Sequence, residues 1–331
     1  MNRLSEADPL ARDLKGLVEA EVGFRPLAGE VLVEALPSSR KVLRFTFPED
    51  NYAVVGKFFS ASVFRTSADL SLVREYDHYL RLPALGLGNG DGLTPRLLGR
   101  WPARSLGLLL EAVPGPDLDH LLLQACVHGN PAPLLRGLEQ LARLLARFHS
   151  RPVSNLPVSP EPGLAYLDKV MAQLLAAGRL TREDRLALET ERACWEDRLV
   201  DFTDRQVLIH GDATPTNFLF PNGEAVALDL ERLGPGDRLW DLSWVAGELK
   251  HAWGWRTTNF CGSEAAIRHF FRMYLNATDF DPALTDRLFQ LNPFYMALAE
   301  LRIARNLYLT PDYRRELVAE ARRCLVHGRR L

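Results

Sequence analysis

The stretch that decides the fold reads QVLIHGDATPTN from Gln206 to Asn217 and continues with AVALDLE at 225–231. Its two apolar runs, QVLIH and AVALDL, are short and contain β-branched residues, which predicts two short strands separated by a loop. Three side chains of catalytic type, those of Asp212, Asn217 and Asp229, lie on the loops that these strands border. We therefore expect a polar site built on a small β element.

The residue types in this segment suit one kind of chemistry. Phosphoryl transfer needs a carboxylate that orients and deprotonates the attacking hydroxyl, together with an amide oxygen and a second carboxylate that hold Mg²⁺ against nucleotide phosphates. Asp212, Asn217 and Asp229 supply these three groups in that order along the chain. In addition, a carboxylate within an apolar strand, as expected for Asp229, is costly unless it is ion-paired or bound to metal.

Glu231 lies two positions after Asp229. On a strand, both side chains would project to the same side, so that Glu231 could reach a second metal ion or the substrate. The alternative is that Glu231 forms an ion pair with Arg232 or Arg238. Both interpretations remain open from the sequence.

The chain changes character near residue 113. Before it, helices are expected at 5–20, with Ser5 as N-cap, and at 67–82, with Ser67 as cap. Five strands are expected in the same part, at 31–36, 41–47, 52–59, 96–101 and 106–113. After it, helical patterns dominate, at 117–127, 134–149, 163–177, 181–200, 238–252, 262–275, 283–309 and 311–327. We expect an α+β protein with an antiparallel β N-lobe, five strands plus a helix, at 1–113, and a mainly helical C-lobe at 114–331.

The pattern HGDxxxxN, followed in the second apolar run by Asp229 in DxE, resembles the aminoglycoside phosphotransferase and choline kinase superfamily. The resemblance extends to Lys57 in YAVVGKFF and to Glu75 in the helix expected at 67–82. It also includes three motifs, LLLEAVPG at 108–115, LARFHS at 145–150 and GDRLWDLS at 236–243. The resemblance implies a bilobal protein-kinase-like fold.

The same resemblance implies an ATP-dependent phosphotransferase that acts on a hydroxyl of a small molecule such as an antibiotic, sugar or amino alcohol. Asp212 would be the catalytic base, while Asn217 and Asp229, with Glu231 as a further candidate, would hold Mg²⁺. His210 and Asp241 would support the catalytic loop through hydrogen bonds without touching substrate.

On the nucleotide side, the resemblance implies that Lys57, braced by Glu75, contacts the α- and β-phosphates. The adenine would bind the backbone of Glu111 and Val113. The connection LPSSRK at 36–41 departs from the nucleotide-loop pattern because it has no GxGxxG, so phosphate contacts are expected from Ser38, Ser39 and backbone N–H groups.

Two other functions fit the sequence less well. Asp241 follows Asp229 too closely in the chain to leave room for the activation segment of a protein kinase. A nucleotide-binding pseudokinase or regulatory module would be favoured if Asp212 or Asp229 were missing, and both are present. The sequence therefore favours a kinase with a small-molecule acceptor.

Composition excludes several classes of protein. The 331 residues are 47% hydrophobic and 25% charged, which is typical of a globular domain and not of a disordered chain. A net charge of −2 argues against a nucleic-acid binder. The four cysteines are widely separated along the chain, which fits reduced thiols and no zinc site. The polar start MNRLSEADPL and the lack of a long apolar run predict a cytoplasmic protein without a membrane segment.

The sequence leaves the acceptor and the oligomeric state open. The segment 313–331 carries six arginines, which would favour an anionic or neutral acceptor if it borders the site and would say nothing if it lies elsewhere. The aromatic stretch HAWGWRTTNF at 251–260 could offer ring faces to a sugar or a quaternary amine, or could belong to the core.

Overall fold

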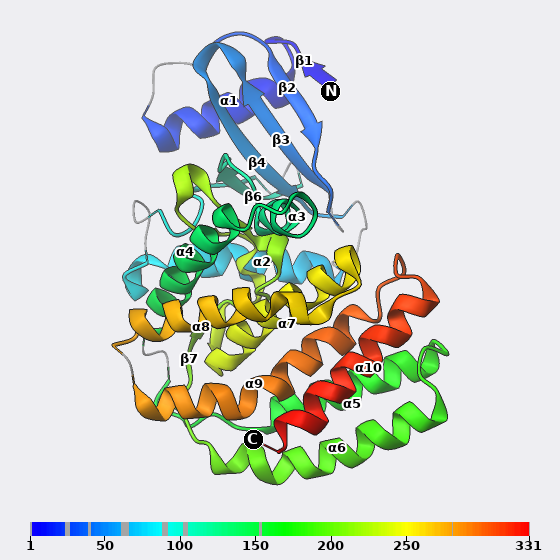
Figure 1. Cartoon of the computed structure of the whole chain (residues 1–331). Coiled ribbons are helices and arrows are strands. Elements are labelled where there is room, and N and C mark those ends of the chain that lie inside the picture. The colour runs from blue at the N-terminus through cyan, green and yellow to red at the C-terminus, as the bar shows by residue number, and fades with distance from the viewer. Residues whose placement is uncertain are drawn as a thin grey trace. The chain divides into compact units, whose positions relative to one another are not determined.

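The computed structural model describes residues 2–23, 27–38, 41–60, 66–87, 92–101, 105–151, 154–279 and 281–330 (Figure 1). The chain divides into two compact units. The first unit comprises Met1–Gly115 and Val226–Leu233, and the second comprises Pro116–Ala225 and Gly234–Leu331. The domain bounds expected from the sequence, 1–113 and 114–331, stay a prediction.

The first unit is built on a six-stranded antiparallel sheet. Its spatial order is β1 (Asn2–Leu4), β2 (Val31–Ala35), β3 (Val42–Phe47), β4 (Tyr52–Phe58), β6 (Leu106–Glu111) and β5 (Leu97–Trp101). The expectation of five strands was one too few. The additional strand, β1, pairs Arg3 with Leu32 at the edge of the sheet, and it is too short for an alternating pattern to be visible in the sequence.

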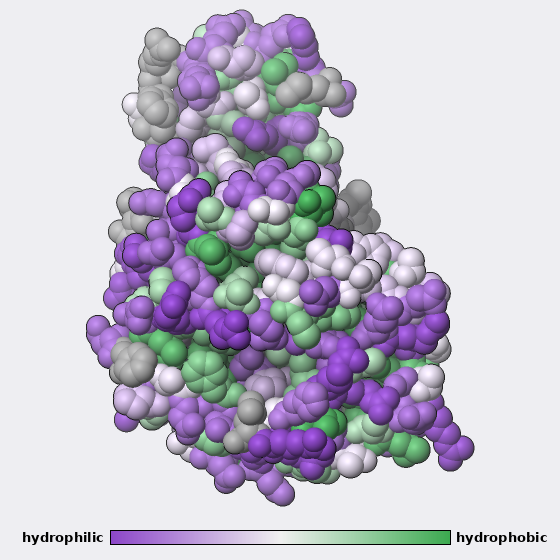
Figure 2. Space-filling model, in the orientation of Figure 1, coloured by the Kyte–Doolittle hydropathy of each residue, from purple (hydrophilic) through white to green (hydrophobic). Residues whose placement is uncertain are grey.

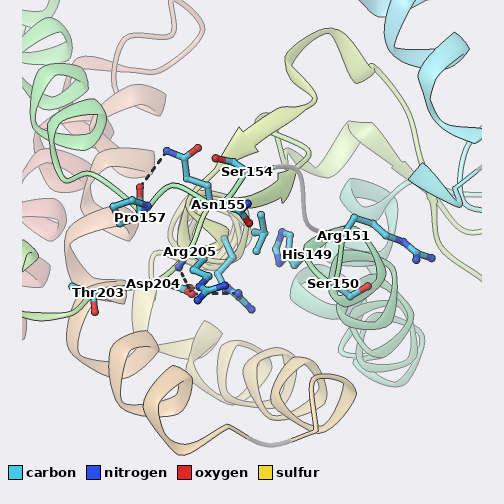
Figure 3. Close-up of a pocket in the computed structure, with 12 residues that line it drawn as sticks. His149, Ser150, Arg151, Ser154, Asn155, Pro157, Thr203, Asp204 and Arg205 are labelled. Carbon is cyan, nitrogen blue, oxygen red and sulfur yellow. Dashed lines mark hydrogen bonds and ion pairs between the residues drawn. The ribbon is translucent and has the colours of Figure 1, made fainter. Parts of the chain in front are cut away.

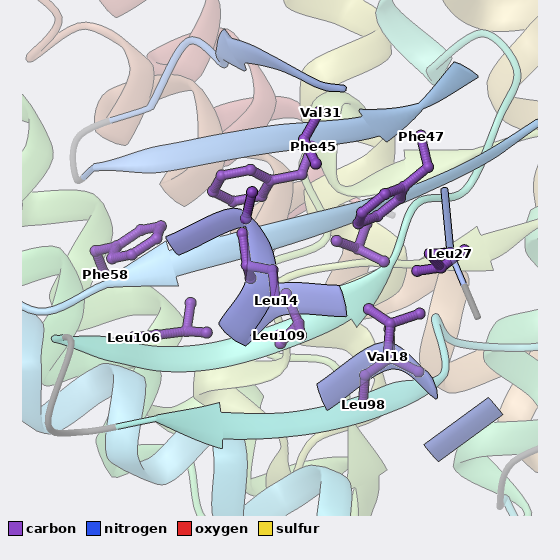
Figure 4. Close-up of a cluster of buried hydrophobic side chains, with 12 residues drawn as sticks. Leu14, Val18, Leu27, Val31, Phe45, Phe47, Phe58, Leu98, Leu106 and Leu109 are labelled. Atoms are coloured by element: carbon purple, nitrogen blue, oxygen red, sulfur yellow. The ribbon is translucent and has the colours of Figure 1, made fainter. Parts of the chain in front are cut away.

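Helix α1 (Pro9–Val22) packs its apolar face on this sheet. Leu14 and Val18 are fully buried against Phe45, Phe47 and Val31, as Figure 4 shows. The N-cap expected at Ser5 was wrong. The helix begins after Asp8, whose side chain accepts the Leu10 N–H at 2.8 Å, because Pro9 favours the first helical position and disfavours a helical residue before it.

Helix α2 (Ser67–Arg81) is fixed at its start by a capping box in which Thr66, and not Ser67, is the N-cap. The carboxylate of Asp69 accepts the Thr66 N–H at 2.8 Å and also both the N–H and the hydroxyl of Ser60, at 2.8 and 2.6 Å. These hydrogen bonds tie the residues that follow β4 to the first turn of α2. They hold the two elements that carry Lys57 and Glu75 in a fixed register.

The second unit is mainly helical. It contains α3 (Leu118–His128), α4 (Ala132–His149), α5 (Glu161–Ala176), α6 (Arg182–Asp201), α7 (Arg238–Thr257), α8 (Glu264–Ala277), α9 (Pro282–Ile303) and α10 (Pro311–Gly328). A two-stranded antiparallel ladder joins β7 (Val207–Ile209) to β10 (Gly234–Gly236). The core of the second unit includes the large buried side chains of Trp195, Trp244 and Phe294. The helix expected to reach residue 309 ends at Ile303.

The α+β fold class expected from the sequence is confirmed. Figure 2 shows one face of the molecule, on which hydrophilic residues predominate and apolar residues form small patches. Within the described residues, none of the helices has both the length and the apolar composition that a membrane crossing requires.

Candidate active site

In the first unit, Lys57 lies at the centre of an ion-paired cluster. Its Nζ is 2.6 and 2.8 Å from the two carboxylate oxygens of Glu75 on α2, and 2.8 Å from Oδ1 of Asp229. Lys57 alternates on β4 with the buried residues Gly56 and Phe58, and the Glu75 side chain is fully buried. The cluster therefore places one ammonium group between two carboxylates in a largely buried position.

The electrostatics keep Lys57 cationic. Burial alone would lower the pKa of its ammonium group, but the carboxylates of Glu75 and Asp229 outweigh this effect and raise the pKa above its usual value. A buried cation of this kind is suited to bind an anion such as a nucleotide phosphate.

The segment that carries Asp229 has an unusual backbone. Asp229 adopts a left-handed conformation with φ 58° and ψ 59°, which aspartate tolerates better than most side chains do. The 3₁₀ helix η6 (Leu230–Arg232) follows directly. The ring Nδ1 of His78 on α2 lies 2.7 Å from the carbonyl oxygen of Leu230. Helix α2 thus supports this segment through His78 and, by way of Lys57, through Glu75.

The strand geometry expected around Glu231 was wrong. Strand β9 covers only Val226–Ala227, and Glu231 lies in the 3₁₀ helix η6, so the rule that alternate residues share a side does not apply to it and Asp229. Its carboxylate lies 3.8 Å from Nε of Arg232, which is one of the two ion pairs considered from the sequence. A metal-binding role of Glu231 stays a prediction.

The backbone after β6 offers alternating hydrogen-bonding groups. The N–H of Glu111 donates to the carbonyl of Arg96 at 2.9 Å, and the N–H of Ala112 donates in the opposite direction to Ala53 at 3.0 Å. Val113 lies beyond the end of β6 at Glu111, so the strand ladder does not use its backbone groups. The adenine contacts expected at Glu111 and Val113 stay a prediction.

Of the two serines expected near the phosphates, Ser38 is exposed just after β2. Ser39 lies outside the described residues, so its expected contact is not described.

In the second unit, the loop after β7 is held by a buried carboxylate. Asp241, on the first turns of α7 and fully buried, accepts the backbone N–H groups of His210 at 2.7 Å and of Gly211 at 2.8 Å. The buried His210 accepts the N–H of Asp212 through Nδ1 at 3.3 Å. Gly211 has φ 77°, a conformation that favours glycine. These bonds fix the direction in which the chain enters Asp212.

The side chain of Asn217 closes the loop. Its Nδ2 donates to the carbonyl of Asp212 at 2.9 Å, and that carbonyl also accepts the Thr214 N–H at 2.7 Å. Because the amide nitrogen is used in this way, the amide oxygen of Asn217 is the atom left to act as a ligand. The Asp212 side chain is 18% exposed, so its carboxylate is accessible from solvent while its backbone is fixed.

His149 belongs to this support, although the sequence did not single it out. Its Nε2 lies 3.1 Å from the Asp241 carboxylate and its Nδ1 lies 2.8 Å from the hydroxyl of Tyr274. Burial lowers the pKa of His149, against an opposing effect of Asp241. The motif LARFHS contains this residue, and its position in that motif is the only signal that the sequence offers for it.

Two further side chains beside Asp212 carry no local signal in the sequence. Arg302 on α9 has Nη1 at 4.0 Å from Oδ1 of Asp212, and it also forms an ion pair with Glu248 on α7. Its guanidinium lies over the ring of Trp244, 5.1 Å from the centroid. Burial raises the pKa of Glu248, whereas Arg302 acts to lower it. Arg302 therefore adds a positive charge beside the predicted catalytic base.

A cavity of about 400 Å³ adjoins the loop that carries Asp212. Thr214 and Thr216 of that loop form part of its wall, together with side chains from α3, α7 and the end of α9. The other lining residues are Asp119, Leu122, Pro215, Glu248, His251, Ala252, Trp255, Arg256, Arg302, Ile303, Asn306 and Tyr308. We refer to this space as the loop cavity.

A second cavity of the same unit, about 540 Å³, is drawn in Figure 3. His149 and Ser150 from the end of α4 face it, as do Asp204 and Arg205 from the segment before β7. Neither Asp212 nor another residue of 210–217 lines it. The loop cavity, and not this one, is therefore next to the predicted base.

Comparison with known proteins gives a consistent result. A family model described as "Phosphotransferase enzyme family" (APH) matches residues 38–288. The aminoglycoside 3'-phosphotransferase of Salmonella typhimurium is 28% identical to this chain over 147 residues, which cover 41% of this chain and 50% of that protein. The chain thus spans about half the length of the curated relatives it matches.

Solved structures show the same fold at lower identity. An aminoglycoside phosphotransferase of Streptomyces rimosus, in complex with ADP and streptomycin, is 20% identical, with a TM-score of 0.53, 88% of this chain and 97% of that chain covered. An ethanolamine kinase of Plasmodium vivax is 13% identical, with a TM-score of 0.58 and coverages of 88% and 82%. These likenesses confirm the predicted protein-kinase-like fold.

Proposed function

The chain belongs to the phosphotransferase enzyme family, and from that premise we propose that it transfers the γ-phosphate of ATP to a hydroxyl of a small molecule. The observation that carries the proposal is the cluster in which Glu75 and Asp229 hold the Lys57 ammonium group, at 2.6 to 2.8 Å. Such a cluster combines a fixed cation for phosphate oxygens with a carboxylate of the type that binds Mg²⁺.

The proposed nucleotide contacts are made by residues of the first unit. Lys57 would contact the α- and β-phosphates, and the backbone groups of Glu111 and Val113 would bind adenine. Ser38 and Ser39 would add contacts to the phosphates. Glu75 would act as a positioning residue through its contact with Lys57.

The donor set fits magnesium. Asn217 offers an amide oxygen and Asp229 a carboxylate, and hard oxygen ligands are those that Mg²⁺ prefers. When bound, Mg²⁺ would neutralise negative charge on the phosphates. Glu231 is a further candidate ligand.

Asp212 would act on the acceptor. Its carboxylate would orient the hydroxyl and take its proton as the hydroxyl oxygen forms a bond to the γ-phosphorus and the bond to the β-phosphate oxygen breaks, releasing ADP. His210 and Asp241 would hold the loop in place through the backbone hydrogen bonds described above. Positioning and charge stabilisation would supply most of the acceleration.

The test is ADP release from Mg·ATP by the purified protein with aminoglycosides, sugars, cyclitols, amino alcohols and nucleosides as acceptors. Asp212→Asn should lower acceptor-dependent turnover roughly a hundredfold or more while ATP still binds. Asp201→Asn, at an exposed position on α6, is the matched control and should keep full activity.

Two outcomes would contradict the proposal in different ways. Near-normal turnover of Asp212→Asn would show that Asp212 is not the base. Tight Mg·ATP binding without turnover on any acceptor would favour the alternative of a nucleotide-binding regulatory module.

A further inference from the structure

The charged side chains that line the loop cavity are paired with one another. Nη2 of Arg256 lies 2.7 Å from Oδ1 of Asp119, and Arg302 forms an ion pair with Glu248. Among the described residues of the lining, each carboxylate therefore has an arginine as its partner. In these two ion pairs the negative and positive charges of the cavity wall balance each other.

The histidine of the lining is also uncharged. Burial, together with the charges of Arg256 and Arg302, lowers the pKa of His251 to about 4. The Tyr313 hydroxyl lies 3.0 Å from the carbonyl oxygen of His251 and 2.9 Å from Nδ1 of the same residue. In the tautomer in which the hydroxyl donates to the carbonyl, Nδ1 carries the proton and donates to the tyrosine oxygen. The lone pair of Nε2 is then available to accept a hydrogen bond from a hydroxyl group.

Two aromatic rings of the lining keep much of their surface exposed. Trp255 is 40% exposed and Tyr308 is 63% exposed, and their centroids lie 6.1 Å apart with an interplanar angle of 81°. Large apolar rings left exposed at a cavity are typical of a ligand site. A tryptophan face can cover the apolar C–H face of a ring whose edge carries hydroxyl groups.

The arginines of the C-terminal segment do not change this charge balance. Arg314 donates to the carbonyls of Ala304, Asn306 and Leu309, at 2.8 to 2.9 Å. Arg322 and Arg329 pair with Asp184 and Glu191 on α6, and no residue of α10 is among the described residues that line the loop cavity. The basic character of 313–331 is therefore not a guide to the acceptor.

We propose that the loop cavity binds an uncharged polyhydroxylated ring, a sugar or cyclitol, as the acceptor. This inference rests on the proposed function. A polycation would lose water at a wall whose carboxylates are already neutralised, and an anion would meet arginines that are already paired. A neutral ring loses less on desolvation, stacks on Trp255 and donates a hydrogen bond to His251.

The test is isothermal titration calorimetry with matched pairs of probes, in the presence of Mg·ADP. Methyl glycosides of the common hexoses and myo-inositol are each compared with the analogue in which one hydroxyl is replaced by an amino group. The expected result is that at least one neutral ring binds as tightly as its amino analogue or more tightly. Tighter binding of the amino analogue throughout, or no binding of any neutral ring, would overturn the inference.

A variant that removes the cation of one ion pair in the cavity wall tests the role of charge directly. Arg256→Gln leaves Asp119 without its cation, so the preference should shift about tenfold toward the amino analogue. The double variant Asp119→Asn, Arg256→Gln removes both charges and should restore the original preference. A preference that does not move in Arg256→Gln would contradict the charge-balance argument.

The outcomes separate this inference from the proposed function. Calorimetric binding needs no turnover, so the expected preference without any ADP release would contradict the kinase proposal and the acceptor role, while the preference of the cavity for a neutral ring would stand. ADP release that is fastest with amino compounds would leave the kinase proposal standing and overturn the neutral acceptor.

Discussion

At the scale of single residues, the Lys57 ammonium group is held by two carboxylates of very different exposure. The side chain of Glu75 is fully buried, whereas that of Asp229 is 32% exposed. A buried ion pair contributes little net stability by itself, but loss of one partner leaves a costly buried charge. The bond from Lys57 to Glu75 therefore fixes the lysine in place, and the more exposed Asp229 is the partner that can face a ligand.

Lys57→Met is expected to weaken ATP binding by about tenfold or more, because the charge opposite the phosphates is lost. It should also lower the free energy of unfolding by roughly 3 kcal/mol, because Glu75 remains buried without a cation. Nucleotide titration and urea denaturation measure the two effects. Lys169→Met, an exposed position on α5, is the control, and equal ATP affinity in both variants would refute the phosphate role.

His149 provides a prediction about pH. Burial lowers its pKa below the usual value of about 6.5, so the folded state keeps the ring neutral while the unfolded state takes up a proton. Stability is thus fully present above pH 6.5 and is lost as the pH falls below it, by up to about 1.4 kcal/mol per pH unit.

His149→Gln should flatten this dependence when urea midpoints at pH 7.5 and pH 5.0 are compared. His128→Gln changes an exposed histidine of α3 and should keep the slope of the native protein. A slope that is the same in all three proteins would show that His149 does not titrate as its burial requires.

At the scale of elements, three helices meet at a buried polar cluster. Lys250 on α7 lies 2.7 Å from Glu320 on α10, and Glu300 on α9 has a ligand atom within 4.8 Å of those of Glu320 and Cys324. Burial raises the pKa of Glu300 well above its usual value, although Lys250 acts to lower it. Glu300 is therefore protonated in the folded state under conditions where it would ionise in the unfolded state.

Glu300→Gln follows from this difference. An acid whose pKa is raised on folding destabilises the folded state as the pH rises above the unfolded value of about 4.3. The glutamine variant avoids this loss, so it should be more stable than the native protein at pH 8 and close to it at pH 4.5. Thermal unfolding at both values measures this. Glu316→Gln, at an exposed position of α10, should show no such gain.

At the scale of the whole molecule, features that depend on residues close together in the sequence were predicted better than contacts between residues far apart in the sequence. Asp212 and Asn217 were predicted on one loop because they are only five residues apart in the sequence, so they stay close together in any fold. The position of Glu231 was misjudged because the strand already ends at Ala227 and the left-handed Asp229 leads into a 3₁₀ helix, and aspartate gives only a weak signal for that conformation.

The side chains of the loop cavity could not be found in this way. Glu248 and Arg302 are far apart in the sequence and meet only because α7 packs against α9. Their pairing results from tertiary packing. In the sequence, each of the two residues has the features of an ordinary charged residue on the surface of a helix. The sequence therefore pointed to the polar side chains of the loop but not to the charged side chains of the cavity beside it.

The first unit is completed by Val226–Leu233, a segment far from the rest of it in the chain, and this order has a consequence for synthesis on the ribosome. Glu75 is made soon after Lys57, but Asp229 is added 172 residues after Lys57. At about 5–20 residues per second, that interval lasts on the order of 10 to 30 seconds. During that interval Glu75 is the only one of the two carboxylates yet available to Lys57, and the second ionic partner of the lysine has still to be synthesised.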